Sequence, residues 1–317
     1  MRNRYVELSE LEASIPLFSR PWWLDAVAGE RSWDVVLVER DGVLHASMPF
    51  VFTHRYGHRF ISQPILTQHL GPWLRAGGAK YAKELARQKD LCEELIRQLP
   101  RYDHFFQNFH HQQTNWLPFF WQGFKQTTRY TYVLPDLSDE KKIWDGFQAN
   151  IRTDIKKASN RFGVKVRAGL CIREFFALNS LVFKRQGMAM PYDLAQIERL
   201  DQACAKRGCR RIFIAEDAEG RPHAAVYVVW DEKSAYYLMG GGDPELRNSG
   251  ATSLCMWEAV RFAATVTQRF DLEGSMLEPV ERFFRGFGAV QVPYSSLSRT
   301  PSRLLQCVQF ARTLIKS

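Results

Sequence analysis

Residues 235–242 read AYYLMGGG, and this stretch decides the fold. Its apolar and aromatic residues predict a strand that stops at the glycines Gly240–Gly242. A polar turn follows, with RNSGA at Arg247–Ala251, and an apolar helix begins near Ser249. A strand, a glycine-rich turn and a helix in this order predict an anion site, because the first turn of a helix presents N–H groups without partners. We therefore expect a phosphate-bearing ligand there.

The residues around this stretch predict a mixed sheet. Upstream, three strands at 211–216, 224–230 and 235–239 form a meander, and two helices at 172–186 and 193–206 precede them. A further strand at 127–134 leads into a helix that is expected to start at 135–138, to run through Ala158 and to end at Gly163, with a short strand at 164–167 after it. Downstream, Phe270–Leu272 is a second short strand. Strands alternating with helices in this way favour a sheet with helices on both faces.

The first 122 residues repeat this order of elements in a looser form. Strands at 33–39 and 43–50 flank the hairpin signal Asp41–Gly42, and an amphipathic helix at 79–99 precedes a strand at 102–109. A chain of 317 residues exceeds what one core usually fills. We predict the α/β class (an α+β mixed sheet) in two domains, 1–122 and 123–300, followed by an amphipathic helix at 301–317.

Composition and charge limit the partners. The chain has 43 Lys and Arg against 34 Asp and Glu, a formal charge of +9. This excess favours a polyanionic partner such as a nucleotide, RNA or an anionic lipid surface. The alternative is that the positive charge only makes the surface basic and soluble. DNA is not expected. The six cysteines form no C-x-x-C pair, which is typical of reduced thiols. The first residues hold no apolar signal core and no run of about eighteen apolar residues occurs, so we expect a cytoplasmic protein.

A metal site is not expected from the histidines. His104, His110 and His111 lie close together in the sequence, but no acidic or thiol ligand stands at a recognisable spacing from them.

Five segments together resemble the Fem branch of the GNAT-type acyltransferases, which includes the peptidoglycan bridge aminoacyltransferases. They are the helix around 150–158 with its end at Gly163, the strand 236–240, the segment 250–259, the strand 270–275 and the run FFRGFG at Phe283–Gly288. The resemblance covers 124–295 closely and the earlier residues loosely. It implies two tandem GNAT-like domains, each a mixed sheet flanked by helices, with the chemistry in the second. It also implies transfer of an acyl group to an amine.

The resemblance implies a donor site at the glycine-rich turn. Arg247, Asn248, Gly250 and Ala251 resemble the loop that holds the pyrophosphate of acyl-CoA, although Thr252 stands where Gly or Ala is usual. Acyl-CoA is therefore the expected donor substrate. Fem enzymes instead take an aminoacyl group from tRNA, so aminoacyl-tRNA is the alternative donor. The acceptor is an amine on a small molecule or a cell-wall precursor, which can be lipid-linked.

The expected catalytic residues follow from their positions. Tyr237 is expected to orient the substrate or relay a proton, and Asp271 or Glu273 to act as the base. The Fem branch has a lysine where this chain has Phe284, so either Arg285 steadies the oxyanion or backbone N–H groups suffice for it. Each has a structural alternative: Tyr237 as a core tyrosine, Asp271 as a backbone cap, and Arg285 as the ion-pair partner of Glu281. Loss of activity, leaving a binding module, is the alternative that Phe284 allows.

Three further residues are assigned to substrate binding. Arg152 and Lys156 lie on a basic helical face that would hold phosphate or would simply be solvated. Tyr192 ends an apolar turn that suits the lip of a substrate cleft. The basic amphipathic helix at 301–317 either packs on the protein or contacts a membrane surface.

Overall fold

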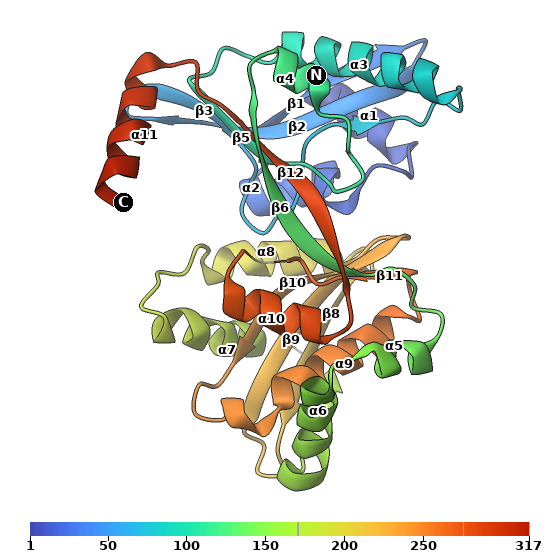
Figure 1. Ribbon diagram of the computed structural model, residues 1–317, viewed down its shortest axis with the longest axis vertical. Helices are drawn as coiled ribbons and strands as arrows, with labels where there is room; N and C mark the ends of the chain where they lie inside the picture. The colour runs from blue at the N-terminus through green and yellow to red at the C-terminus, as the bar shows by residue number, and fades with distance from the viewer. Residues whose placement is uncertain (170, 275, 317) are drawn as a thin grey trace. The chain divides into compact units, whose positions relative to one another are not determined.

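The computed structural model describes residues 1–169, 171–274 and 276–316, and these form two compact units (Figure 1). Unit 1 comprises Met1–Arg129 and Pro293–Ser317, and unit 2 comprises Tyr130–Val292. The last strand and helix of the chain thus belong with the first half. The domain boundaries at 122/123 and 300/301 stay a prediction.

Unit 1 is a mixed sheet in the order β1-β2-β3-β5-β12, with β4 paired to β2. Its helices are α1 (Arg2–Glu10), η1 (Leu17–Ser19), α2 (Pro21–Ala28), α3 (Tyr81–Gln98), α4 (Leu117–Trp121) and α11 (Arg303–Lys316), and its strands are β1 (Trp33–Arg40), β2 (Val43–Arg55), β3 (His58–Ser62), β4 (Trp73–Leu74), β5 (His104–Asn108) and most of β12 (Val290–Arg299). The predicted turn at Asp41–Gly42 joins β1 to β2, and both residues have positive φ. Pro21 opens α2, where its fixed φ suits the first helical position.

In unit 2 the strands of the mixed sheet follow the order β6-β11-β10-β9-β8-β7. Its strands are β6 (Lys125–Leu134), β7 (Lys165–Ala168), β8 (Arg210–Glu216), β9 (Pro222–Trp230), β10 (Ser234–Gly242) and β11 (Arg269–Asp271), and its helices are α5 (Glu140–Gly146), α6 (Ala149–Phe162), α7 (Ile172–Arg185), α8 (Leu194–Ala205), η2 (Arg247–Ser249), α9 (Ala251–Ala263) and α10 (Glu278–Gly286). β10 and β11 are parallel, whereas β9 is antiparallel to both β8 and β10. The predicted α/β class with a mixed sheet is confirmed.

Helices cover both faces of the sheet in unit 2 (Figure 1). Alternate residues of β9 point to opposite faces. Val226 and its neighbours on one face belong to the core cluster that includes α6 and α9. Tyr227, on the other face, packs its ring 5.7 Å from Phe175 of α7. α9 is buried along most of its length because it lies between the sheet and α6.

Two local predictions were wrong. The single helix expected from 135–138 through Ala158 is two helices, α5 and α6, separated at Phe147 and Gln148. Phe147 has an extended backbone and is fully buried. Its side chain packs in the core from this extended conformation, which interrupts the helix. The strand expected to stop at Met239 continues to Gly242, because the three glycines pair with residues 224–226 of β9.

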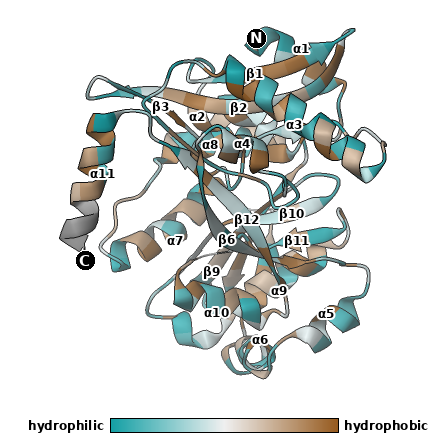
Figure 2. Cartoon of the chain, turned by 45° about the horizontal axis from the view of Figure 1, so that its top comes forward, coloured by the Kyte–Doolittle hydropathy of each residue, from teal (hydrophilic) through white to brown (hydrophobic). Residues whose placement is uncertain are grey.

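The coloured part of the C-terminal helix α11 carries both hydrophilic and hydrophobic residues (Figure 2). Among its described side chains, Leu304 and Phe310 are 62% and 67% exposed. No helix in the described part of the chain is long and apolar enough to cross a membrane.

Candidate functional site

The parallel strands β10 and β11 pair only over the first three residues of β10, because β11 is three residues long. Residues 234–236 of β10 face residues 269–271 of β11, and the pairing ends there. On its other side β10 stays paired with β9 up to Gly242, with an irregularity between Tyr237 and Met239 that leaves Leu238 as an extra residue. One edge of β10 beyond Tyr236 therefore has no strand partner in the described part of the chain, although the carbonyl of Gly240 accepts from the side chain of Asn179 on α7.

Glu273 lies just after β11, beside this unpaired edge. Both oxygens of its carboxyl group are buried, and neither has a hydrogen-bond partner among the described residues. Burial, together with the charge of Asp271, raises the pKa of Glu273 well above its usual value. Its backbone has φ +52°, a left-handed conformation that is uncommon for a residue with a side chain. A buried carboxyl group without a partner is unusual in folded proteins and is typical of functional sites.

Asp271, in contrast, has hydrogen-bond partners for one of its carboxyl oxygens. It is 5% exposed, and its Oδ1 accepts hydrogen bonds from the hydroxyl of Thr131 and from the backbone N–H of Glu273. Burial raises the pKa of Asp271 to about 6, although these two hydrogen bonds oppose the shift. Asp271 thus acts on the backbone of Glu273, as the capping alternative predicted, while Glu273 has the unengaged carboxyl group.

Tyr237 lies between these acidic residues and the core. Its ring packs at 5.8 Å against Phe284 in an edge-to-face contact, and its hydroxyl lies directly beside the Cα of Gly240. Burial, together with neighbouring Cys255, Glu273 and Tyr192, raises the pKa of Tyr237. The structure therefore brings Tyr237, Glu273 and Tyr192 together, and keeps the Tyr237 hydroxyl protonated at neutral pH.

Asn179, in the middle of α7, links Tyr192 to β10. Its side-chain NH2 donates to the carbonyl of Gly240 at 2.6 Å, and its Oδ1 accepts from the Tyr192 hydroxyl at 2.8 Å. Sequence reasoning missed Asn179. The signal was an amide at a buried position on the apolar face of α7, between Phe175 and Val182. Gly241 is required beside it, because a Cβ there would meet the backbone of Asn179 at 2.6 Å.

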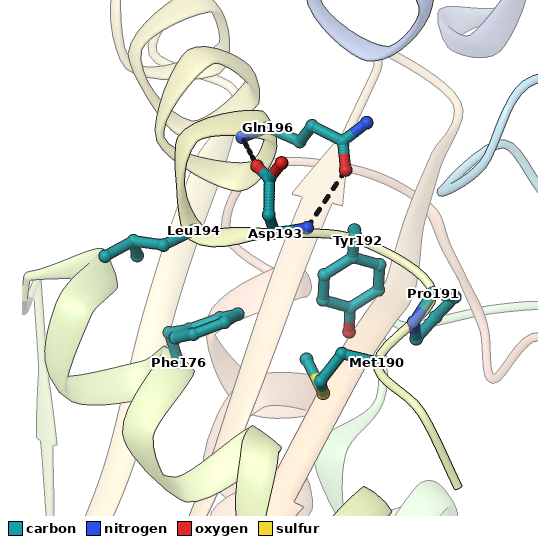
Figure 3. A pocket seen from close by; sticks show the side chains of 7 residues that line it. All are labelled: Phe176, Met190, Pro191, Tyr192, Asp193, Leu194 and Gln196. Atoms are coloured by element: carbon teal, nitrogen blue, oxygen red, sulfur yellow. Dashed lines mark hydrogen bonds between the residues drawn. The ribbon is translucent and has the colours of Figure 1, made fainter.

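Tyr192 also lines an open pocket of about 500 Å3 (Figure 3). The side chains of Phe176, Met190 and Tyr192 face this pocket, so its lining is mainly apolar. Its polar rim belongs to the capping box of α8, in which Asp193 and Gln196 bind each other's backbone N–H groups. Tyr192 therefore contacts the pocket with its ring, while its hydroxyl is held by Asn179.

The predicted anion loop consists of η2 and the first turn of α9. Arg247 and Asn248 are exposed, and neither side chain has a partner among the described residues. The N–H of Ala251 binds Ser249 Oγ at 3.3 Å. The N–H groups of Gly250 and Thr252 have no partner in the described part of the chain. Two free amides beside an exposed arginine at a helix N-terminus fit a phosphate group.

Gly250 fixes this loop against α6. Its φ is +84°, and a Cβ there would lie 2.3 Å from the carbonyl oxygen of Asp154. The contact brings the middle of α6 to the loop, and Lys156 is exposed there without an ion pair in the described part of the chain. Arg152 has a different role, since its guanidinium donates to the carbonyls of Asp145 and Phe147 at 3.0 and 2.7 Å and closes the corner between α5 and α6.

Arg285 and Phe284 lie on α10. Arg285 pairs with Glu281 at 2.9 Å and is 52% exposed, as the ion-pair alternative predicted. Glu281 also accepts from the Tyr132 hydroxyl at 2.6 Å. Phe284 is 4% exposed and belongs to the core of unit 2. The position where the Fem branch has a lysine is therefore a packing position in this chain.

Comparisons with known proteins agree with this geometry. Residues 146–281 match the model of the Acetyltransferase (GNAT) domain. Among solved structures, FemX is 12% identical and has a TM-score of 0.68 over 97% of this chain and 98% of that one. The C-terminal domain of a lysylphosphatidylglycerol synthetase-like protein from Agrobacterium fabrum is 11% identical, with a TM-score of 0.58 over 99% and 96%. A tandem GNAT protein from the clavulanic acid biosynthesis pathway is 13% identical, with a TM-score of 0.50 over 94% of each chain.

At these identities the structures show the fold. A search of curated proteins finds no match to this sequence. The fold and the domain match define an acyltransferase of the GNAT type. Residues 146–281 thus match a GNAT acyltransferase domain, and the chain as a whole has the tandem, Fem-like fold that the sequence resemblance predicted.

Proposed function

We propose that this enzyme transfers an acyl group from acyl-CoA to a primary amine, on a small molecule or on a cell-envelope precursor, in the cytoplasm. The observation that supports this best is the buried carboxyl group of Glu273, which has no hydrogen-bond partner among the described residues and lies beside the end of the β10–β11 pairing. An attacking amine must lose a proton, and Glu273 is the acidic residue there whose oxygens no described residue engages.

The residues of the site have separate roles in this proposal. The amine nitrogen attacks the thioester carbonyl, the C–S bond breaks, and Glu273 accepts the proton that the nitrogen releases. Main-chain N–H groups on the unpaired edge of β10 stabilise the oxyanion, so the phenylalanine at position 284 does not prevent catalysis. Tyr237, which stays protonated, orients the substrate or returns a proton to the leaving thiolate. Asp271 positions the backbone of Glu273.

The donor and acceptor would bind on opposite sides of this centre. Arg247 and the free amides of Gly250 and Thr252 would hold the pyrophosphate of acyl-CoA, and Lys156 is near enough along α6 to contribute charge. The pocket lined by Phe176, Met190 and Tyr192 would take an apolar part of the acceptor. Acyl-CoA enters this proposal as a substrate, and the likeness of the fold to the tandem GNAT protein of the clavulanic acid pathway, a structure without AcCoA, is compatible with it.

Aminoacyl-tRNA is the second candidate for the donor. The likeness to FemX over nearly the whole chain and the formal charge of +9 favour it. RNA binding that depends on phosphate contacts weakens steeply with salt. We would therefore measure CoA binding by calorimetry and tRNA binding at about 50 and 200 mM salt. Saturable CoA binding without tRNA affinity supports the first proposal, and tRNA binding with a steep salt slope supports the second. If the protein binds neither CoA nor tRNA, the remaining alternative is a non-catalytic binding protein with the GNAT fold.

A lipid-linked acceptor would explain the exposed apolar residues of α11. Leu304, Val308 and Phe310 are 62%, 40% and 67% exposed beside Arg303, which suits peripheral contact with an anionic membrane. Sedimentation with vesicles of an anionic phospholipid tests this contact. Replacing Leu304 and Phe310 together by Ser should abolish co-sedimentation, and retention of the variant on vesicles would contradict it.

A further inference from the structure

A chain of buried hydrogen bonds runs from the β8–β9 turn to the anion loop. Asp217 Oδ2 lies 3.1 Å from Nε2 of His223, and Nδ1 of His223 lies 2.9 Å from Oγ of Ser249. His223 and Ser249 are 3% and 2% exposed, and Asp217 is 9% exposed. Ser249 Oγ in turn accepts from the N–H of Ala251 at 3.3 Å. Three residues that are distant in sequence thus connect one turn to the first residue of α9.

The direction of these hydrogen bonds follows from Asp217. Its carboxylate accepts from the side chain of Arg221 and from the N–H groups of Glu219 and Arg221. Burial raises the pKa of Asp217, but the hydrogen bonds from His223 and Arg221 outweigh burial and hold this pKa well below the usual value. A carboxylate needs a donor, so Nε2 of His223 carries a proton. In the neutral ring Nδ1 is then the acceptor, and the hydroxyl of Ser249 donates to it. The lone pairs of Ser249 are left for the N–H of Ala251.

This arrangement differs from the Ser-His-Asp site of a hydrolase. There the carboxylate binds Nδ1 and the serine binds Nε2, whereas His223 has the two partners exchanged. Ser249 is almost fully buried, and its oxygen already accepts a backbone N–H. The group is therefore built to hold the loop and not to attack a substrate.

The hydrogen bonds of Ser249 determine which N–H groups at the start of α9 stay without a partner in the described part of the chain. Ser249 occupies the N–H of Ala251 and leaves those of Gly250 and Thr252 without partners in the described part of the chain. On its other side the loop is fixed by the contact of Gly250 with α6. The backbone of His223 also accepts from the N–H of Asp243 at 3.0 Å, which fixes the entry into the loop.

We propose that His223 and Ser249 are positioning residues for the donor phosphate. With Asp217 they hold the first turn of α9 so that the amides of Gly250 and Thr252 point at the anion. This inference rests on the proposed donor site, because the phosphate it serves is that of the proposed acyl-CoA. It adds a positioning function for Asp217 of the β8–β9 turn, which is linked to the anion loop through His223 and Ser249.

The test removes the hydrogen bond between His223 and Ser249 by replacing one partner or the other, with Ser249→Ala and His223→Gln, alone and together. Hydrogen exchange measured without ligand should be about 10-fold faster for the amides of 250–254 in each variant, since a lost buried hydrogen bond changes an equilibrium by this order. The double variant should be no worse than the singles, because they break one interaction. CoA should bind about 10-fold more weakly, while kcat at saturating donor changes less than about 3-fold.

Asp201→Asn is the matched control. Asp201 belongs to another buried network, with Tyr227 at 3.0 Å and Arg210, on the opposite face of the same sheet. The Asp201→Asn variant should lower the stability of unit 2 and leave the amide hydrogen exchange of residues 250–254 unchanged. Unchanged exchange in the Ser249 and His223 variants would overturn the inference. A wild-type protein that fails to bind CoA would refute the proposed donor instead, while the exchange data still decide whether the loop is held.

Discussion

The backbone N–H of Glu273 donates a hydrogen bond to Oδ1 of Asp271 at 2.8 Å. This bond helps hold Glu273 at φ +52°, where a non-glycine backbone stores roughly 1–3 kcal/mol of strain. The two carboxyl groups are two residues apart in the sequence and differ in their hydrogen bonds. One is bonded twice, and the other is buried and has no partner in the described part of the chain.

Glu273→Gln should lower kcat by about 10²- to 10⁴-fold, the usual contribution of a general base. Donor affinity should stay unchanged. In the wild type, kcat/KM should rise with pH through a pKa above the ordinary glutamate value, because burial raises the pKa of Glu273 and a base must be ionised to act. The variant should lack this rise. The exposed Glu232→Gln serves as the control, and a pH profile that survives in Glu273→Gln would exclude Glu273 as the base.

Asp271 should make stability depend on pH. Its folded pKa of about 6 lies above the unfolded value near 3.8, so the folded state holds the proton more tightly. Stability from this group is therefore complete below about pH 4 and is lost as the pH rises to about 6, by roughly 3 kcal/mol. Asp271→Asn should flatten this part of the profile. Denaturant unfolding of the wild type and of Asp271→Asn between pH 4 and 7 measures both stabilities. The stability of the variant relative to the wild type should rise with pH, and a constant difference would contradict the shifted pKa.

The sequence predicted most elements of unit 2 because their signals are local. The glycine-rich turn, the apolar residues of α9 and the alternation in β8 and β9 each depend on neighbouring residues, and these elements form close to where they were expected. The break between α5 and α6 was missed because Phe147 fits a helical spacing in the sequence, while the core holds it extended. The continuation of β10 through three glycines was missed because its cause is pairing with β9.

The site was only partly predictable for a similar reason. Tyr237 and Glu273 follow from their positions at strand ends, but nothing local shows that the carboxyl group of Glu273 lacks a partner. His223 and Ser249 are 26 residues apart, and only the packing of η2 over β9 brings them together. A histidine opening an apolar strand, AAVYVV after His223, was the available signal. The ion pair of Arg285 could be stated in advance because i,i+4 spacing on a helix suffices for it.

Gly250→Ala should lower stability by about 2–4 kcal/mol. The new Cβ would be in a left-handed conformation, which costs roughly 1–2 kcal/mol, and it would also meet the carbonyl of Asp154 at 2.3 Å. Gly220→Ala is the matched control, since Gly220 has φ +76° and open space around its Cα. It should show the conformational cost alone. Equal losses in the two variants, measured by denaturant unfolding, would mean that α6 does not press on the loop.

Arg247→Ala should weaken CoA binding at least 10-fold, because an exposed arginine without an ion pair in the described part of the chain is free to bind phosphate. Arg285→Ala is the matched comparison. Arg285 is also exposed, but it pairs with Glu281, and such surface pairs contribute about 0–1 kcal/mol. Its loss should change kcat and CoA affinity less than about 3-fold. A large fall in kcat for Arg285→Ala, with CoA affinity intact, would instead restore Arg285 as the group that steadies the oxyanion, and would require its side chain to leave Glu281 when substrate binds.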